Sequence, residues 1–225
     1  HSASYMNSAL RFPLNTSPAQ HAQLVKLQQS FAEVCNALAP LVQQTRCWNR
    51  VALHHMAYKQ LRESFPGMGS QMVCNAIYSV SRASRHIFQH PQSHFNVNRL
   101  GTRPLPRLHF LPQAPVYFDR HTLSIKSGQV SMYTMDGRIH FELGLGPDAE
   151  LRFRRERLRE ILLTSDRGGF QLAFHFASGE ESAEVQAEMV AAASGAELPE
   201  YLLVNEDPPS AGALVPAAAR AAQLL

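Results

Sequence analysis

Three histidines, His86, His90 and His94, recur at intervals of four residues. On an unbroken helix this spacing would place the three imidazoles on one side, where they could bind a transition metal. Pro91 lies between the second and the third, and proline ends helices because it has no backbone N–H to donate. The sequence therefore predicts a helix that ends near His90, and no metal site at these residues.

Cysteine is the second residue type that could carry chemistry. Cys35, Cys47 and Cys74 are separated by 12 and 27 residues, and no CxxC pair is present to begin a zinc ribbon. An odd number of cysteines also argues against a disulfide framework. We expect three reduced, mostly buried thiols, and we expect no cofactor.

Arginine is the third residue type that could carry chemistry. It is concentrated in Leu151–Leu163, LRFRRERLREILL, where it occupies positions 152, 154, 155, 157 and 159. This segment is either a basic amphipathic helix or a strand followed by a helix. Its arginines would contact phosphates, or they would form a solvated helix face whose charge Glu156 and Glu160 temper. Both interpretations stay open.

Charge is distributed unevenly along the chain. His1 to His175 contains 20 Lys or Arg and 10 Asp or Glu, whereas Phe176 to Leu225 contains one Arg and eight acids. A body with a net charge of +10 suits a polyanion, because each phosphate that a cation neutralises releases counterions. The alternative is a solvated basic surface.

Composition indicates a folded chain, because 45% of its residues are hydrophobic and 17% are charged. A length of 225 residues allows one medium domain or two small ones,. No apolar run approaches the roughly 20 residues that a membrane span requires, so we expect a soluble, cytoplasmic protein without a membrane partner. His1–Tyr5 resembles a tag remnant before a native Met6 and not a signal peptide.

Helical periodicity dominates the first hundred residues, after a short strand at Ala9–Leu14. A first helix should begin at Pro18, with Thr16 or Ser17 as N-cap, and run to about Ala39, where Pro40 breaks or kinks it. A second should run from about Asn49 to Ser64, and a third, capped by Ser70, from Gln71 to about Phe88. The residues expected to face inward are Leu24, Leu27, Phe31, Val34 and Leu38 in the first helix and Val73, Ile77, Val80 and Ser84 in the third.

From residue 96 onward the pattern changes. Residues 96–115 are rich in proline and predict an extended connector. Short β-type runs follow at 116–118, 122–125, 129–134, 138–141 and 170–176, separated by Ser127-Gly128, Asp136-Gly137 and Gly168-Gly169, which is typical of a small barrel or sandwich. After Ala177, Ala, Glu, Gly, Ser and Pro dominate. We expect only a marginal helix at 185–193 and a marginal strand at 201–204.

Two blocks of residues stand in a definite order along the chain. The first is Trp48-Asn49, His54, Tyr58, Leu61-Arg62-Glu63, Phe65, Ser70-Gln71, Ala76-Ile77, Val80 and Ala83; the second is Val116–Asp119, Leu123–Lys126, Val130-Ser131, Thr134–Ile139 and Gly168–Leu172. Together they cover roughly 130 of the 225 residues. In this order they resemble the N-terminal half of TnpB-type proteins, transposon-encoded RNA-guided nucleases related to type V CRISPR effectors.

The resemblance implies an α+β fold: a small antiparallel β-barrel of wedge or OB type with an inserted three-helix recognition bundle. The composition after Ala177 predicts an acidic low-complexity tail behind it. The implied parts are the first barrel strand at 6–15, the helical recognition insertion at 16–95, a connector at 96–115, the rest of the barrel at 116–177 and the tail at 178–225. The tail would be mobile or would dock a partner.

The resemblance also implies a nucleic-acid site. Gln71 aligns with a glutamine that faces the DNA motif, and an amide can pair with adenine N6 and N7; the alternative is an ordinary exposed helix residue. Ser70, Asn75 and Tyr78 would lie near that face, while Trp48 would stack on a base or pack in the core. The cations expected to contact phosphates are Arg46, Arg50, Lys59, Arg62, Arg82, Arg85, Arg103, Arg107, Arg152, Arg154 and Arg155.

In the family a RuvC-like nuclease follows, in which three carboxylates hold two metals. The nearest segment here, Leu203–Asp207, lacks the family's glycines and precedes Pro208-Pro209, so we expect no enzyme. The expected function is binding of structured guide-type RNA, with duplex target DNA as a further candidate, as a subunit beside a separate catalytic chain or as a regulator. The alternatives are a scaffold protein whose acidic tail docks a basic partner without binding RNA, and a fragment or decayed remnant of a nuclease.

Overall fold

The computed structural model describes residues 9–167, 169–177 and 199–207. The chain divides into two compact units. The first, called the β unit, contains the described residues 9–28, 115–167 and 169–177; the second, called the helical unit, contains residues 29–114 and 199–207. Helix α1 (Pro18–Thr45) contributes its first part to the β unit and the remainder to the helical unit.

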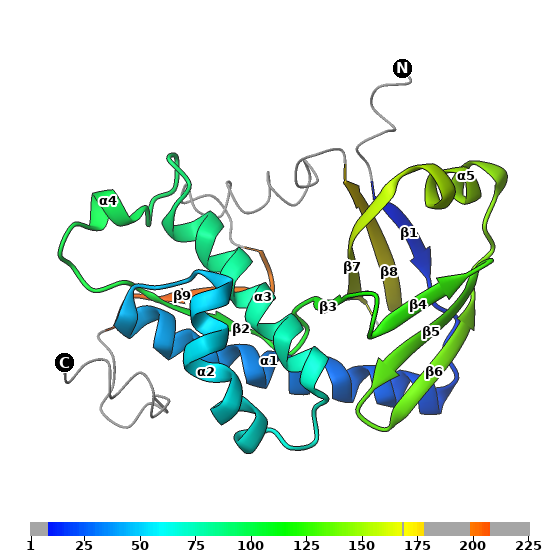
Figure 1. The fold of residues 1–225 in the computed structure, drawn as a ribbon, viewed down its shortest axis with the longest axis horizontal. Helices are drawn as coiled ribbons and strands as arrows, with labels where there is room; N and C mark the ends of the chain where they lie inside the picture. The colour runs from blue at the N-terminus through cyan, green and yellow to red at the C-terminus, as the bar shows by residue number, and fades with distance from the viewer. Residues whose placement is uncertain (1–8, 168, 178–198, 208–225) are drawn as a thin grey trace. The chain divides into compact units, whose positions relative to one another are not determined.

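The larger sheet of the β unit has the order β1-β8-β7-β3 and is antiparallel throughout. Its strands are β1 (Leu10–Pro13), β8 (Gly169–Ala177), β7 (Arg157–Asp166) and β3 (Val116–Phe118). Leu10 pairs with Phe174, so the expectation that the first strand joins the later ones is confirmed. Figure 1 shows β1 beside β8 although the two strands lie far apart in the sequence.

The second sheet of the β unit is a three-stranded meander, β4 (Leu123–Lys126), β5 (Gln129–Thr134) and β6 (Gly137–Glu142). Both turns fall where the sequence predicts them. Ser127 and Gly128 have φ of 51° and 80°, the left-handed pair that a tight hairpin requires. A Cβ at Gly128 would also lie 2.7 Å from the Leu143 carbonyl oxygen, so glycine is needed there for space as well.

The expected closed barrel is not present in the described residues, although the mixed α+β class is. The strands of the β unit form two separate sheets. Between β3 and β4 the Asp119 carboxylate accepts from the Thr122 hydroxyl at 2.7 Å and from its N–H at 3.1 Å, which turns the chain out of the first ladder. At the other edge Pro13 supplies no N–H for a further strand.

Helix α5 (Pro147–Arg155) precedes β7, so Leu151–Leu163 is a helix followed by a strand. This matches neither of the two interpretations of the sequence, a helix throughout or a strand followed by a helix. Pro147 stands at the start, Asp148 and Glu150 lie in the first turn and three arginines in the last, an order that complements the helix dipole. From Arg157 onward, pairing with β8 imposes the extended conformation. Pairing with β8 therefore determined the conformation of a segment whose local sequence pattern was ambiguous.

Helix α1 begins as predicted. Ser17 Oγ accepts from the Gln20 N–H at 3.1 Å, and Gln20 Oε1 accepts from the Ser17 N–H at 3.0 Å, a reciprocal cap. The five residues expected to face inward are all buried. The prediction that this helix runs only to about Ala39 is wrong, since it continues past Pro40 to Thr45. Leu41 and Val42, both buried, stabilise the additional turn enough to offset one missing hydrogen bond.

Helices α2 (Arg50–Ser64) and α3 (Ser70–Phe88) pack on one another. Asn49 caps α2 through its side chain, which accepts from the Ala52 N–H. Ser70 is not the cap of α3: Gly69 is extended and its carbonyl accepts from the Val73 N–H, so Ser70 is already helical. The end of α3 at Phe88, before Pro91, is confirmed.

The expected extended connector is wrong in part, because residues 96–115 contain helix α4 (Val97–Leu100) and strand β2 (Arg107–Phe110). Leu108 and Phe110 are buried on one side of β2, and the strand pairs antiparallel with β9 (Leu202–Asn205). The marginal strand expected at 201–204 is thus confirmed. The expected helix at 185–193 and most of the acidic tail lie outside the described residues.

Two side chains of α1 fasten the β2–β9 ribbon. Asn36 Nδ2 donates to the Phe110 carbonyl at 2.8 Å, and the Phe110 N–H donates to Asn36 Oδ1 at 2.7 Å. Gln43 Nε2 donates to the carbonyls of Leu105 and Asp207 at 3.1 and 3.2 Å. Helix α1 therefore satisfies backbone groups that a further strand would otherwise pair with. Within the ranges described, no helix combines the length and apolar character needed to cross a bilayer.

Candidate nucleic-acid interface

Helices α2 and α3 present a row of polar and aromatic side chains on the helical unit. Residues four apart on α2 and three or four apart on α3 share a side of their helix. Leu53, Ala57 and Leu61 form the buried side of α2. The row consists of Arg50, His54 and Tyr58 on α2 and Gln71, Cys74 and Tyr78 on α3, and we call it the α2–α3 face.

Contacts across the two helices hold this face together. The Arg50 guanidinium lies 5.9 Å from the centroid of the Tyr78 ring, in range of a cation–π interaction. His54 stacks on Tyr58, with ring centroids 4.5 Å apart and planes at 15°, and its Nδ1 is 3.9 Å from Cys74 Sγ. Arg50 and His54 are exposed and the other members of the face are half-buried, so a ligand would reach both charge and ring surfaces.

The helical unit carries an excess of positive charge. Its described residues contain nine Lys or Arg and five acids, Glu33, Glu63, Glu200, Glu206 and Asp207. Arg85 is exposed on α3 seven residues after Tyr78, two helical turns along the same side,. Lys59 is also exposed, but it follows Arg50 by nine residues, about 180° around the helix. Arg85 therefore extends the face and Lys59 does not.

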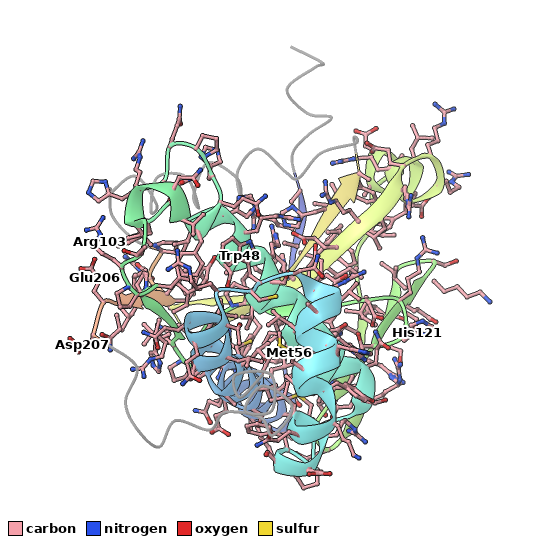
Figure 2. All side chains as sticks on the ribbon, turned by 60° about the vertical axis from the view of Figure 1, so that its left-hand side comes forward. Trp48, Met56, Arg103, His121, Glu206 and Asp207 are labelled. Carbon is pink, nitrogen blue, oxygen red and sulfur yellow. The ribbon has the colours of Figure 1, made fainter. Side chains whose placement is uncertain are left out.

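Two predicted phosphate-contacting arginines fasten a loop instead. Arg46, which has a positive φ of 54°, donates from its guanidinium to the carbonyls of Arg103 at 2.8 Å and Gly101 at 3.0 Å. Arg103 donates to the carbonyls of Arg99 and Leu100. Arg103 is labelled in Figure 2 in the loop before β2. These guanidiniums have hydrogen-bond donors committed to the backbone, which is a structural role.

Burial separates other predicted residues from the surface. Asn75 is 2% exposed and Arg82 is 9% exposed, so neither belongs to the accessible α2–α3 face. Arg62 is half-buried and donates to the Met68 carbonyl, which holds the turn between α2 and α3. Ser70 is exposed at the start of α3, and Arg107 is half-buried on β2.

Trp48 packs within the helical unit. Its ring lies 5.6 Å from that of Phe88, its indole N–H donates to Gln89 Oε1 at 3.0 Å, and its carbonyl accepts from the Ser81 hydroxyl at 2.6 Å. Trp48 and, on α2, Met56 are labelled in Figure 2. Of the two roles considered for Trp48, this geometry favours packing.

The arginines of α5 belong to the β unit and have different surroundings. Arg152 is half-buried, donates to Glu156 at 2.6 Å and lies 4.6 Å from the Phe176 ring centroid. Arg154 and Arg155 are exposed. The predicted cations are thus divided between two units, and only Arg50 and Arg85 accompany the α2–α3 face.

The thiols differ in accessibility. Cys35 is buried and burial raises the pKa of its thiol far above the usual value,, whereas Cys47 and Cys74 are half-buried. All three are free. In the part of the chain that the structure describes, no group of three or more His, Cys, Asp or Glu side chains is arranged to hold a metal ion.

Sequence reasoning did not assign His54 or Cys74 to the face. A signal was present, since Arg50, His54 and Tyr58 follow one another at intervals of four, but the partner helix could not be placed beside them from the sequence.

A comparison with protein-family models finds no matching family, and a comparison with curated proteins finds no match.

Proposed function

We propose that this protein binds structured RNA of the guide type through the α2–α3 face, as a TnpB-like, nuclease-free component of an RNA-guided complex or as a regulator. Duplex target DNA is the second ligand in this proposal. The chemistry of the complex would reside in a separate catalytic chain. The face supplies what such a role requires: cations for phosphates, rings for bases, and an amide for base edges.

The observation that carries the proposal is the alternation of charge and ring on one accessible face. Arg50 lies against Tyr78, and His54 stacks on Tyr58. Proteins that hold single-stranded nucleic acid combine a positive groove with aromatic platforms, and each stacked base contributes about 1–3 kcal/mol. With nine cations to five acids among the described residues of the helical unit, the phosphate contribution would be favourable for any sequence.

Gln71 is the proposed base-reading residue. It is half-buried in the first turn of α3, on the same side as Cys74 and Tyr78. An amide at an exposed helix start can form two hydrogen bonds to adenine in the major groove, which discriminates by about 1–3 kcal/mol. Gln71→Ala should therefore weaken sequence preference on duplex DNA and leave non-specific binding nearly unchanged.

The first test is RNA binding by the full chain as a function of salt. RNA that co-purifies with the protein is sequenced, and a representative hairpin is titrated between low and high salt. We expect a log–log slope of several units. A preparation free of nucleic acid, with no shift of hairpin RNA at low salt, would contradict the proposal and favour the scaffold alternative.

Point variants then locate the interface. Arg50→Gln should reduce the salt slope by about one, the contribution of one phosphate contact. Tyr78→Ala should weaken binding, whereas Tyr78→Phe, which keeps the ring, should bind like the wild type. Lys59→Gln is the matched control, because it removes an exposed cation from the opposite side of the same helix. Equal losses for Arg50→Gln and Lys59→Gln would refute the assignment of the face.

A further inference from the structure

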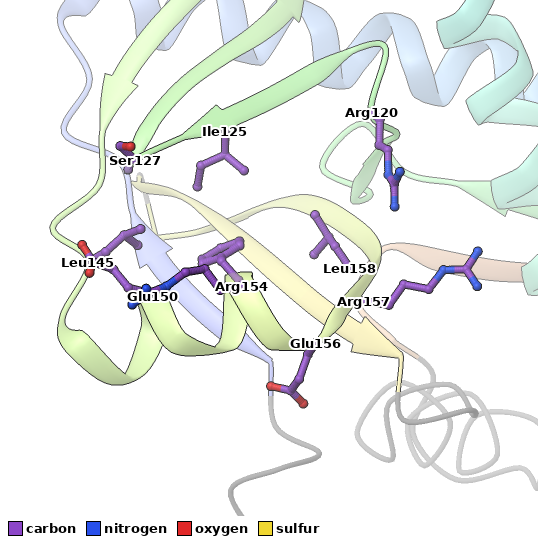
Figure 3. Close-up of a pocket in the computed structure, with 11 residues that line it drawn as sticks. Arg120, Ile125, Ser127, Leu145, Glu150, Arg154, Glu156, Arg157 and Leu158 are labelled. Carbon is purple, nitrogen blue, oxygen red and sulfur yellow. The ribbon is translucent and has the colours of Figure 1, made fainter.

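An open pocket of about 540 Å³ lies in the β unit, independently of the α2–α3 face. It is bordered by α5, the start of β7 and the turn between β4 and β5. Three arginines line it, Arg120 from the loop after β3, Arg154 from α5 and Arg157 from β7. Figure 3 shows the guanidinium groups of Arg120 and Arg157 at one end of the pocket, with Leu158 beside them.

These three guanidiniums are available to a ligand. Among the residues that the structure places, none of the three makes a hydrogen bond or an ion pair with another protein group. Arg120, Arg154 and Arg157 are also exposed. Three pocket-lining cations without a partner among the described residues are unlike the loop arginines of the helical unit, whose donors are occupied by carbonyls.

The charge of the pocket can be counted from its lining. Its two carboxylates are Glu150 and Glu156, and Glu156 is already neutralised by Arg152 at 2.6 Å. Three arginines against the remaining Glu150 leave an excess of two positive charges. A terminal phosphate monoester carries about −1.5 to −2 at pH 7, which matches this excess, whereas a carboxylate or an internal phosphodiester carries only about one negative charge.

The rest of the lining is apolar. Phe153 is half-exposed, and its ring is held edge-on by Phe174 at 5.1 Å and Phe176 at 5.3 Å. Ile125, Leu145 and Leu158 complete the apolar surface. A held aromatic ring beside aliphatic side chains suits a flat heterocycle, and the volume falls within the roughly 300–1,000 Å³ of small-ligand sites.

We propose that this pocket binds a nucleoside carrying a terminal phosphate, with the phosphate on Arg120, Arg154 and Arg157 and the base against Phe153. Two sources share this chemistry: a free nucleoside monophosphate, and the 5′-phosphorylated end of an RNA strand. The site lies in the β unit, so it does not depend on RNA binding by the α2–α3 face.

The test is calorimetric titration of the full chain with the four ribonucleoside 5′-monophosphates, the matching nucleosides and inorganic phosphate. The nucleotides should bind more tightly than either part alone. Arg154→Gln should weaken nucleotide binding by about tenfold or more, the loss expected from one charge-assisted contact. Arg155→Gln is the matched control, since it is exposed on the same helix and does not line the pocket. Far-UV circular dichroism verifies that both variants fold.

A second arm separates the two sources. A short single-stranded RNA with a 5′-phosphate is compared with the same RNA ending in a 5′-hydroxyl. Preference for the phosphorylated strand that Arg154→Gln abolishes identifies a strand end, while binding of nucleotides alone identifies a free ligand. The proposal is overturned if no nucleotide or 5′-phosphorylated RNA binds, if nucleosides bind as tightly as nucleotides, or if Arg155→Gln weakens binding as much as Arg154→Gln. Arg50→Gln should leave nucleotide binding unchanged. A failure of the nucleotide-pocket proposal can therefore be distinguished from a failure of the proposal that the α2–α3 face binds RNA.

Discussion

Asn36 ties helix α1 to the β2–β9 ribbon, and its replacement by alanine measures the strength of that tie. The Leu111 N–H donates to the Tyr201 carbonyl, so on β2 the polar groups of the preceding residue, Phe110, point to the opposite edge, as an antiparallel ladder alternates. Asn36 meets both of them, donating to the carbonyl and accepting from the N–H. Its amide therefore takes the place of a third strand.

The magnitude follows from these two hydrogen bonds. Asn36→Ala would leave one backbone donor and one acceptor without a protein partner, and each such group costs about 1–3 kcal/mol when buried. Asn36 is itself only half-buried, so water would replace part of the loss. We therefore expect the free energy of unfolding to fall by roughly 2–3 kcal/mol. Asn36→Asp should not restore it, because a carboxylate cannot donate to the Phe110 carbonyl.

The assay is urea unfolding followed by the fluorescence of Trp48, the one tryptophan of the chain, which lies in the same unit. Amide hydrogen exchange supplies a local readout: the Phe110 N–H should lose protection in Asn36→Ala while the Leu111 N–H keeps it. Asn98→Ala, at an exposed asparagine, is the control and should change stability by less than about 0.5 kcal/mol. If Asn36→Ala matched this control and Phe110 stayed protected, the reasoning would be refuted.

Three further predictions concern the caps, the loop and the thiols. Arg46→Met should lower the free energy of unfolding by about 1–3 kcal/mol, because two loop carbonyls lose a charged donor; thermal unfolding measures this, and an unchanged midpoint would contradict it. Ser17→Ala removes the α1 cap and should cost about 1 kcal/mol, measured by urea titration against the wild type. Cys35, whose pKa burial raises, should be alkylated much more slowly than Cys47 and Cys74 in native protein, and peptide mass spectrometry that found equal rates would disprove this.

Local signals were sufficient for the start of α1 and for the hairpins. The reciprocal cap at Ser17 and Gln20 needs only residues three apart, and the Ser127-Gly128 turn needs only two residues with positive φ. Both were predictable because the relevant energies are set by neighbours in sequence.

Tertiary packing decided the features that the sequence did not reveal. Helix α1 passes Pro40 because buried residues beyond it hold the last turn. Strand β2 exists because β9 and Asn36 satisfy its two edges, and both partners are remote in sequence. No local pattern carries such information, so a connector was the natural expectation for a proline-rich segment.

In the candidate site, too, the sequence revealed which residue types are present but not which of them are accessible. Residue type identified cations and an amide in the right helices, but Asn75 and Arg82 are buried while Arg50 and Gln71 are accessible. The sequence marks which groups could bind a polyanion, and only the packing of α2 on α3 determines which of them a ligand reaches. Arg157 was among the arginines considered for phosphate contact, but Arg120 was not, and the pocket that both line depends on the β unit's topology.

The pairing of Leu10 with Phe174 has a consequence for biosynthesis. Strand β1 leaves the ribosome long before its partner β8, and at about 5–20 residues per second the delay is on the order of ten seconds. During that interval the nascent strand has an unsatisfied hydrogen-bonding edge. Pro13, within β1, withholds one amide donor from chance neighbours and so lowers the risk of aggregation before the native partner emerges.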